Sequence, residues 1–170
     1  MKRIYLAGPT VFFPDAATHF SKLSALCLEH SLCAVPPADL EDVVSGSPYE
    51  VARAIRAENL KRIREAAGVL ANLMPFRNPV EPDSGTAYEC GYAQALGIPV
   101  CGYLPALEPG HAGRITSAFG VEYRNGLPFD KTWGYLVEDF SEPVNLMLAC
   151  GMPVRGSPEE ALEVLANCVG

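Results

Sequence analysis

The segment 81–91 places two carboxylates, Asp83 and Glu89, around the start of a predicted helix. Asp83 is expected in a loop and Glu89 about one turn inside the helix, on the face that continues with the apolar residues Ala93 and Leu96. Burial there would raise the pKa of Glu89, whereas a helix N-terminus favours negative charge. A poorly hydrated carboxylate that stays ionised is a competent nucleophile toward an anomeric carbon. Glycosyl chemistry pairs such a group with a second carboxyl that manages the proton of the leaving group.

The same segment also fits a purely structural interpretation. Thr86-Ala-Tyr-Glu89 matches a capping box, in which the Glu89 side chain would accept a hydrogen bond from the backbone N–H of Thr86. Asp83 and Ser84 fit as ordinary cap or turn residues. The spacing alone leaves both interpretations open.

The elements that must position these residues alternate between strand and helix. Strands are expected at 3–7, 32–35, 69–73, 98–103 and 152–155, and helices at 15–30, 49–67, 85–96, 143–150 and 157–168. This order predicts one α/β domain over residues 1–170, a doubly wound, flavodoxin-like parallel sheet of about five strands with helices on both faces. Because ligands bind outside the carboxyl ends of such strands, we expect the chemistry in the loops after Ala7, Leu73 and Tyr103.

Two long connections separate these elements. Residues 104–142 show no convincing period and hold many Gly and Pro residues, which predicts a lid or binding flap, with Trp133 and Tyr135 able to close over a substrate. The Pro-rich loop 74–84 contains Phe76 and Arg77, which could stack on or bond to a nucleobase.

Composition restricts the partners. The net charge of −7 argues against a surface for polymeric nucleic acid, which is usually basic. No apolar run approaches the ~20 residues of a bilayer-spanning helix. The apolar stretch after Lys2 and Arg3 is short and interrupted, unlike a secretory signal. We therefore expect a cytoplasmic protein that acts on small molecules, with no membrane partner.

No pattern indicates a metal site or a cofactor. The six cysteines show no ligand spacing, which predicts reduced, mostly buried thiols: Cys27, Cys33, Cys90, Cys101, Cys150 and Cys168. The isolated histidines are expected at the surface or in packing roles: His19, His30 and His111.

Four motifs in order resemble those of the nucleoside 2-deoxyribosyltransferase family. They are Tyr5-Leu-Ala-Gly-Pro9, Asn59-Leu60, the run Glu81-Pro-Asp-Ser-Gly-Thr-Ala-Tyr-Glu-Cys-Gly-Tyr-Ala93 and Pro143-Val-Asn-Leu-Met147. The resemblance covers nearly the whole chain, and its overall pattern, with the loop Met74-Pro-Phe-Arg77, is most similar to the trypanosomatid-type branch.

The resemblance implies a double displacement without a cofactor. Glu89 would attack C1′ of a deoxynucleoside, the base would leave, and a second free nucleobase would attack the deoxyribosyl-enzyme. The family's tyrosine falls on Tyr5, which would orient the nucleophile. Its aspartate falls on Asp83, which would bind substrate and transfer a proton at the base.

The remaining motif positions are expected to bind substrate: Gly8, Asn59, Phe76, Arg77, Gly85, Asn145 and Met147. Asn145 resembles a residue lent to the neighbouring subunit's site, which implies a homo-oligomer. Asn59 stands where many members have Asp. Since an amide cannot deliver a proton as a carboxylic acid can, Asn59 would only hold the base or sugar by hydrogen bonds.

Two other functions suit the same fold. An N-glycosidase that hydrolyses nucleoside 5′-monophosphates would need a phosphate site, with Ser-rich turns or helix N-termini and a converging Arg. A non-catalytic nucleotide-sensing module would keep the pocket without needing Tyr5, Asp83 and Glu89 together. The combination of those three side chains favours transfer.

Overall fold

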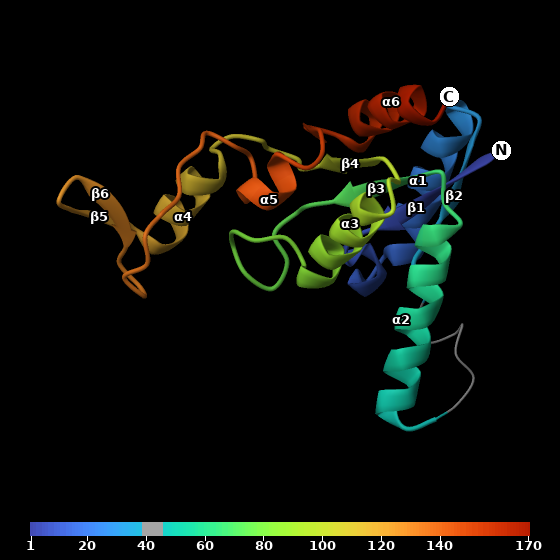
Figure 1. The fold of residues 1–170 in the computed structure, drawn as a ribbon, viewed down its shortest axis with the longest axis horizontal. Coiled ribbons are helices and arrows are strands. Elements are labelled where there is room, and N and C mark those ends of the chain that lie inside the picture. The colour runs from blue at the N-terminus through green and yellow to red at the C-terminus, as the bar shows by residue number, and fades with distance from the viewer. Residues whose placement is uncertain (39–45) are drawn as a thin grey trace.

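The computed structural model describes residues 1–38 and 46–170 and contains a parallel five-stranded sheet (Figure 1). Its strands are β1 (Lys2–Ala7), β2 (Leu32–Val35), β3 (Gly68–Asn72), β4 (Val100–Tyr103) and β7 (Val154–Arg155). They lie in the order β2-β1-β3-β4-β7, and every neighbouring pair is parallel. This is the flavodoxin-like order, so the predicted fold class is confirmed.

Helices cover both faces of the sheet. They are η1 (Pro9–Phe12), α1 (Ala16–Glu29), α2 (Pro48–Arg64), α3 (Ser84–Ala95), α5 (Leu146–Ala149) and α6 (Pro158–Val169). Side chains of α1 and α6 pack on one face, with Ile4 and Leu6 of β1. Those of α2 and α3 pack on the other face, with Tyr5 and Ala7. Because successive strand residues point to opposite faces, Tyr5 is directed toward α2 and α3.

Residues 104–142 are not the structureless loop that was predicted. They contain α4 (His111–Phe119) and an antiparallel hairpin of β5 (Val121–Arg124) and β6 (Leu127–Asp130). The hairpin turn is Asn125-Gly126, and both residues have the positive φ angles, 52° and 81°, that a tight hairpin turn requires. This unit, coloured yellow to orange, projects from the side of the sheet away from α2 (Figure 1).

Other predicted boundaries differ by a few residues. Gly68, expected as the cap of α2, is instead the first residue of β3, because α2 ends at Arg64. The predicted helix 143–150 is reduced to one turn, Leu146–Ala149. These shifts leave the strand-helix order unchanged.

Candidate active site

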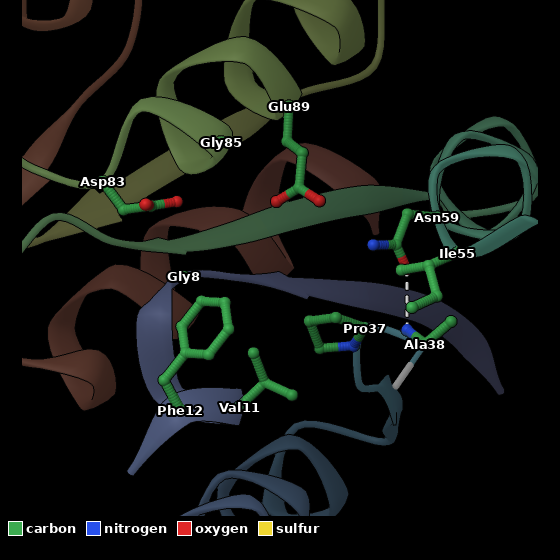
Figure 2. A pocket seen from close by; sticks show the side chains of 10 residues that line it. All are labelled: Gly8, Val11, Phe12, Pro37, Ala38, Ile55, Asn59, Asp83, Gly85 and Glu89. Carbon is green, nitrogen blue, oxygen red and sulfur yellow. Dashed lines mark hydrogen bonds between the residues drawn. The ribbon is translucent and has the colours of Figure 1, made fainter. Parts of the chain in front are cut away.

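A cavity of about 630 Å³ opens at the carboxyl ends of β1 and β3, where the strand order reverses (Figure 2). Loops after β1 and β2, the helix α2 and the start of α3 contribute its lining: Gly8, Val11, Phe12, Pro37, Ala38, Ile55, Asn59, Asp83, Gly85 and Glu89. Its place at the switch point agrees with the general rule for open α/β sheets. The loop that follows Tyr103 contributes nothing to it, contrary to expectation, whereas the loop after β2 does.

Glu89 projects from α3 into this cavity (Figure 2), and Tyr5 holds it by a hydrogen bond. The buried Tyr5 hydroxyl donates a hydrogen bond of 2.6 Å to Glu89 Oε1. Burial raises the pKa of Glu89 to about 7, the Tyr5 hydroxyl opposes this rise, and the charge of Asp83 adds to it. Burial and the Glu89 carboxylate raise the pKa of Tyr5, so that its hydroxyl stays a donor. Near neutral pH the site therefore holds a partly ionised, oriented carboxylate.

The capping-box interpretation of Glu89 is wrong. Asp83 is the N-cap of α3, and its Oδ2 accepts from the backbone N–H of Thr86 at 2.9 Å and from the Thr86 hydroxyl at 3.2 Å. Because α3 begins at Ser84, Glu89 lies too far into the helix to cap it. The cap interpretation of Asp83 is correct, yet the same side chain also lines the cavity.

Two glycines permit this geometry. A Cβ on Gly85 would lie 2.8 Å from Asp83 Oδ2 and would displace the oxygen that caps α3. A Cβ on Gly8, whose φ is +147°, would lie 2.6 Å from the Cβ of Asn72, where the chain leaves β1 beside β3. Both predicted positions thus line the cavity with backbone, and a side chain at either one would collide with a neighbouring residue.

Asn59 lines the cavity from α2. Its Oδ1 accepts a hydrogen bond of 2.7 Å from the backbone N–H of Ala38. Nearby, Arg62 donates to the carbonyl oxygen of Pro36 at 2.9 Å. The segment after β2 is therefore attached to α2 at two points.

Phe12 is a lining residue that sequence reasoning missed. It stacks on Phe76, with ring centroids 5.3 Å apart, and the Arg77 guanidinium lies 5.1 Å from the Phe12 centroid and 4.6 Å from that of Phe76. Phe76 and Arg77 are not among the lining residues, so they support Phe12 from outside the cavity. The position of Phe12 just after Gly8-Pro9, in the loop that follows the first strand, was the available signal.

Asn145 and Met147 lie apart from the cavity. Asn145 caps α5 by accepting from the backbone N–H of Met147 at 3.0 Å, and Met147 is 75% exposed. They border a separate depression beside Glu81 and Gln94. Trp133 and Tyr135 are also exposed and outside the lining, so within one chain the residues 104–142 form no lid over the site.

In the described ranges 1–38 and 46–170, no group of three or more His, Cys, Asp or Glu side chains is arranged to hold a metal ion. Over the same ranges, no helix combines the length and apolarity needed to cross a membrane. The cysteines are only partly as expected, since Cys150 and Cys168 are exposed. His111 is buried against Glu81, with 2.7 Å between His111 Nε2 and Glu81 Oε1, which agrees with a packing role.

Comparisons with known proteins agree with this geometry. The sequence model of the family described as nucleoside 2-deoxyribosyltransferase matches residues 4–147. The structure of a 2-desoxiribosyltransferase from Leishmania mexicana is 33% identical, with a TM-score of 0.76 and 98% of both chains covered. A conserved protein from Enterococcus faecalis, 20% identical with a TM-score of 0.59 and 99% of both chains covered, shares the fold.

A curated relative is the uncharacterized protein C191.05c of Schizosaccharomyces pombe. It is 34% identical over 104 residues, which are 59% of this chain and 48% of the relative. The chain thus spans about half the length of the curated relative that it matches.

Proposed function

Because the chain belongs to the nucleoside 2-deoxyribosyltransferase family, we propose that it exchanges the base of 2-deoxynucleosides through a deoxyribosyl ester on Glu89. The observation that supports this most strongly is the Glu89 carboxylate, which projects into the cavity and is held at 2.6 Å by the buried Tyr5 hydroxyl. The Leishmania mexicana relative is by its description a 2-desoxiribosyltransferase.

The first half-reaction forms the ester. Tyr5 donates to Oε1 of Glu89, so the rotamer of the carboxylate is set and Oε2 is the oxygen assigned to attack C1′. The C1′–N bond breaks and its electron pair leaves with the base. In the second half-reaction a nitrogen of the acceptor base attacks C1′ and the bond between C1′ and Glu89 breaks. Glu89 leaves as a carboxylate, which the hydrogen bond from the Tyr5 hydroxyl stabilises. The acceptor base loses its N–H proton to solvent.

The burial of Glu89 suits this cycle. A carboxylate in a low-dielectric site is poorly solvated as an anion and gains more on forming a neutral ester than an exposed one would. With a pKa of about 7 it is still substantially ionised at neutral pH. The charge of Asp83 nearby would also favour the positive character that develops on the sugar.

A nucleotide-sensing module would have no use for this arrangement. Holding a buried carboxylate against a tyrosine hydroxyl costs solvation energy that a binding pocket alone does not require. For the N-glycosidase alternative, none of the described lining residues is Arg or Lys, and Arg77, in the loop after β3, stacks on Phe12 and Phe76 rather than lining the cavity. Both facts favour transfer.

We propose that the site is completed by a second copy of the chain. Asn145 and Met147 are family motif positions that lie outside the cavity of their own chain, and Met147 is exposed. In a homo-oligomer they would reach the neighbouring cavity, so mixing an Asn145→Ala chain with a Glu89→Ala chain should restore part of the activity that each variant lacks.

Two donors separate the three functions. With deoxyinosine, a transferase makes deoxyadenosine only when adenine is supplied. With deoxyinosine 5′-monophosphate, an N-glycosidase releases hypoxanthine whether or not adenine is present, and a sensor makes no product from either donor. Mass spectrometry after reaction with a slow 2-fluoro-2-deoxynucleoside should place an adduct on the peptide that contains Glu89. An adduct on another peptide would overturn the assignment of the nucleophile.

A further inference from the structure

The amide of Asn59 can adopt only one orientation. The backbone N–H of Ala38 lies 2.7 Å from its Oδ1. A backbone N–H can only donate, so the amide atom that faces it must be the carbonyl oxygen, and the NH₂ group must face the other way. Figure 2 shows this nitrogen directed into the cavity, toward the side where Glu89 lies. Among the residues that the structure describes, Asn59 Nδ2 has no hydrogen-bond partner.

This orientation is built into the protein before any ligand arrives. Arg62, whose side chain is 18% exposed, donates to the carbonyl oxygen of Pro36 and lies 3.2 Å from Glu58. The segment that presents the Ala38 N–H is therefore held against α2 next to Asn59. Asn59 therefore presents its NH₂ group as a donor to the cavity, while its Oδ1 accepts from the backbone N–H of Ala38.

Asn59 and Asp83 lie on opposite sides of Glu89 (Figure 2). The wall next to Asn59 consists of the apolar residues Pro37, Ala38 and Ile55, whereas Val11 and Phe12 lie across the cavity from Glu89, with Phe12 on the Asp83 side. The Asp83 side also presents the Asp83 carboxylate and the backbone at Gly8 and Gly85. A flat heterocycle can lie on the apolar surface beside the Asn59 NH₂ group, which can only donate, whereas sugar hydroxyls need a polar acceptor such as a carboxylate. With C1′ at Glu89, the base then lies toward Asn59 and the sugar hydroxyls toward Asp83.

We propose that Asn59 determines which bases this chain can release, by donating a hydrogen bond to an acceptor atom of the departing base without protonating it. The inference rests on the proposed transferase function. As the C1′–N bond breaks, its electron pair moves onto the base, and the Asn59 N–H stabilises the negative charge that accumulates there. The proton that the free base finally carries comes from water. The rate should therefore depend steeply on the acidity of the base, and acidic bases should leave fastest.

The test compares leaving groups. A series of 6-substituted purine 2-deoxynucleosides, whose free bases differ in acidity, is assayed for kcat/KM at the pH plateau of each protein. In the wild type, log kcat/KM should fall steeply as the pKa of the free base rises. In Asn59→Asp one carboxyl oxygen can still accept from Ala38 while the other can carry a proton, so the slope should become shallower. Asn59→Ala should lose about 10- to 100-fold in kcat/KM, the scale of a hydrogen bond to a charged acceptor.

Asn167→Asp is the matched control, since it makes the same chemical change at an exposed position of α6. It should keep the wild-type slope. Equal slopes for the wild type and Asn59→Asp, with transfer intact, would overturn the role of Asn59 and leave the proposed function standing. A wild-type plot of log kcat/KM against the pKa of the free base that is shallow, and that becomes steep in Asp83→Asn, would also overturn the role of Asn59, because Asp83 would then supply the proton. A wild type that transfers no deoxyribose overturns both. If Asn59→Ala fails to fold, as thermal unfolding would reveal, the comparison with Asn59→Asp decides alone.

Discussion

Removing one oxygen atom, in Tyr5→Phe, should shift the pH dependence of the reaction upward. The Tyr5 hydroxyl is the donor that stabilises ionised Glu89, at 2.6 Å in a buried site. A hydrogen bond to a charged group contributes about 1.5–3 kcal/mol, and one pKa unit corresponds to about 1.4 kcal/mol. Without the hydroxyl the pKa of Glu89 should rise from about 7 by about one to two units.

The acid limb of kcat/KM against pH reports this pKa in the free enzyme. In the wild type it should have its midpoint near pH 7, because Glu89 must be ionised to attack and its pKa is about 7. In Tyr5→Phe the midpoint should move upward by the same one to two units, so that the rate at pH 6.5 falls by about 10- to 100-fold and largely recovers at high pH.

Tyr103→Phe is the control for Tyr5→Phe. Tyr103 is another buried tyrosine, on β4, but it packs on the opposite face of the sheet with α1 and α6. Its loss of a hydroxyl should leave the pH profile where it was. If Tyr5→Phe also keeps the wild-type midpoint, Tyr5 does not set the ionisation of Glu89, and the role that we assign to this hydrogen bond is wrong.

Four further predictions concern the same cavity. Glu89→Gln should lower transfer by about 10³-fold or more, as expected for a lost covalent nucleophile. Burial raises the pKa of Glu89 in the folded protein, so its contribution to stability is complete below the unfolded pKa and is lost as pH rises through about 7. In urea unfolding, Glu89→Gln should therefore be more stable than the wild type by about 2–3 kcal/mol at pH 8, with little difference at pH 4. Deoxyinosine should react faster than inosine, because a 2′-hydroxyl withdraws electrons from an oxocarbenium-like transition state; equal rates would contradict this mechanism. Asn can still cap α3 in Asp83→Asn, so thermal unfolding should stay unchanged. We expect kcat/KM to fall by about 10²-fold or more, because the charge of Asp83 acts on the substrate. An unchanged rate would mean that Asp83 is a cap residue only.

The sheet could be predicted because each strand is a short apolar run between helical patterns, and parallel strands need such crossovers. The unit formed by α4, β5 and β6 could not be predicted in the same way. Its helix contains Gly113, Thr116 and Ser117, which are weak helix formers, and its strands are only partly buried. The turn Asn125-Gly126 and the alternation of Val121-Glu-Tyr-Arg124 were together a usable hairpin signal that the interpretation as a lid missed, although Pro128 weakens the strand pattern on the far side of the turn.

Within the site, the residue pattern by itself identified side chains but not their partners, and the pairing of Tyr5 with Glu89 was expected only from the family resemblance. The pattern at 83–89 fits two overlapping caps, with Asp83 or with Thr86 as the first residue, and only the observed start of α3 at Ser84 decides between them. The contact of Tyr5 with Glu89 joins residues from β1 and α3, and no local rule relates such distant positions. The orientation of Asn59 depends likewise on Ala38, a backbone group from another segment.

At the start of α3, the helix cap and the position of the proposed nucleophile are coupled. Asp83 fixes where the helix begins, and the helical repeat then sets how far Glu89 stands from Tyr5. This cap also requires glycine at position 85, because a Cβ there would lie 2.8 Å from the capping oxygen of Asp83. A side chain at position 85 would displace this oxygen and weaken the cap that fixes the first turn of α3. Glu89 is one turn further along, so its distance from the Tyr5 hydroxyl depends on where that turn lies. The short run from Asp83 to Glu89 therefore specifies the position of the proposed nucleophile as well as its identity.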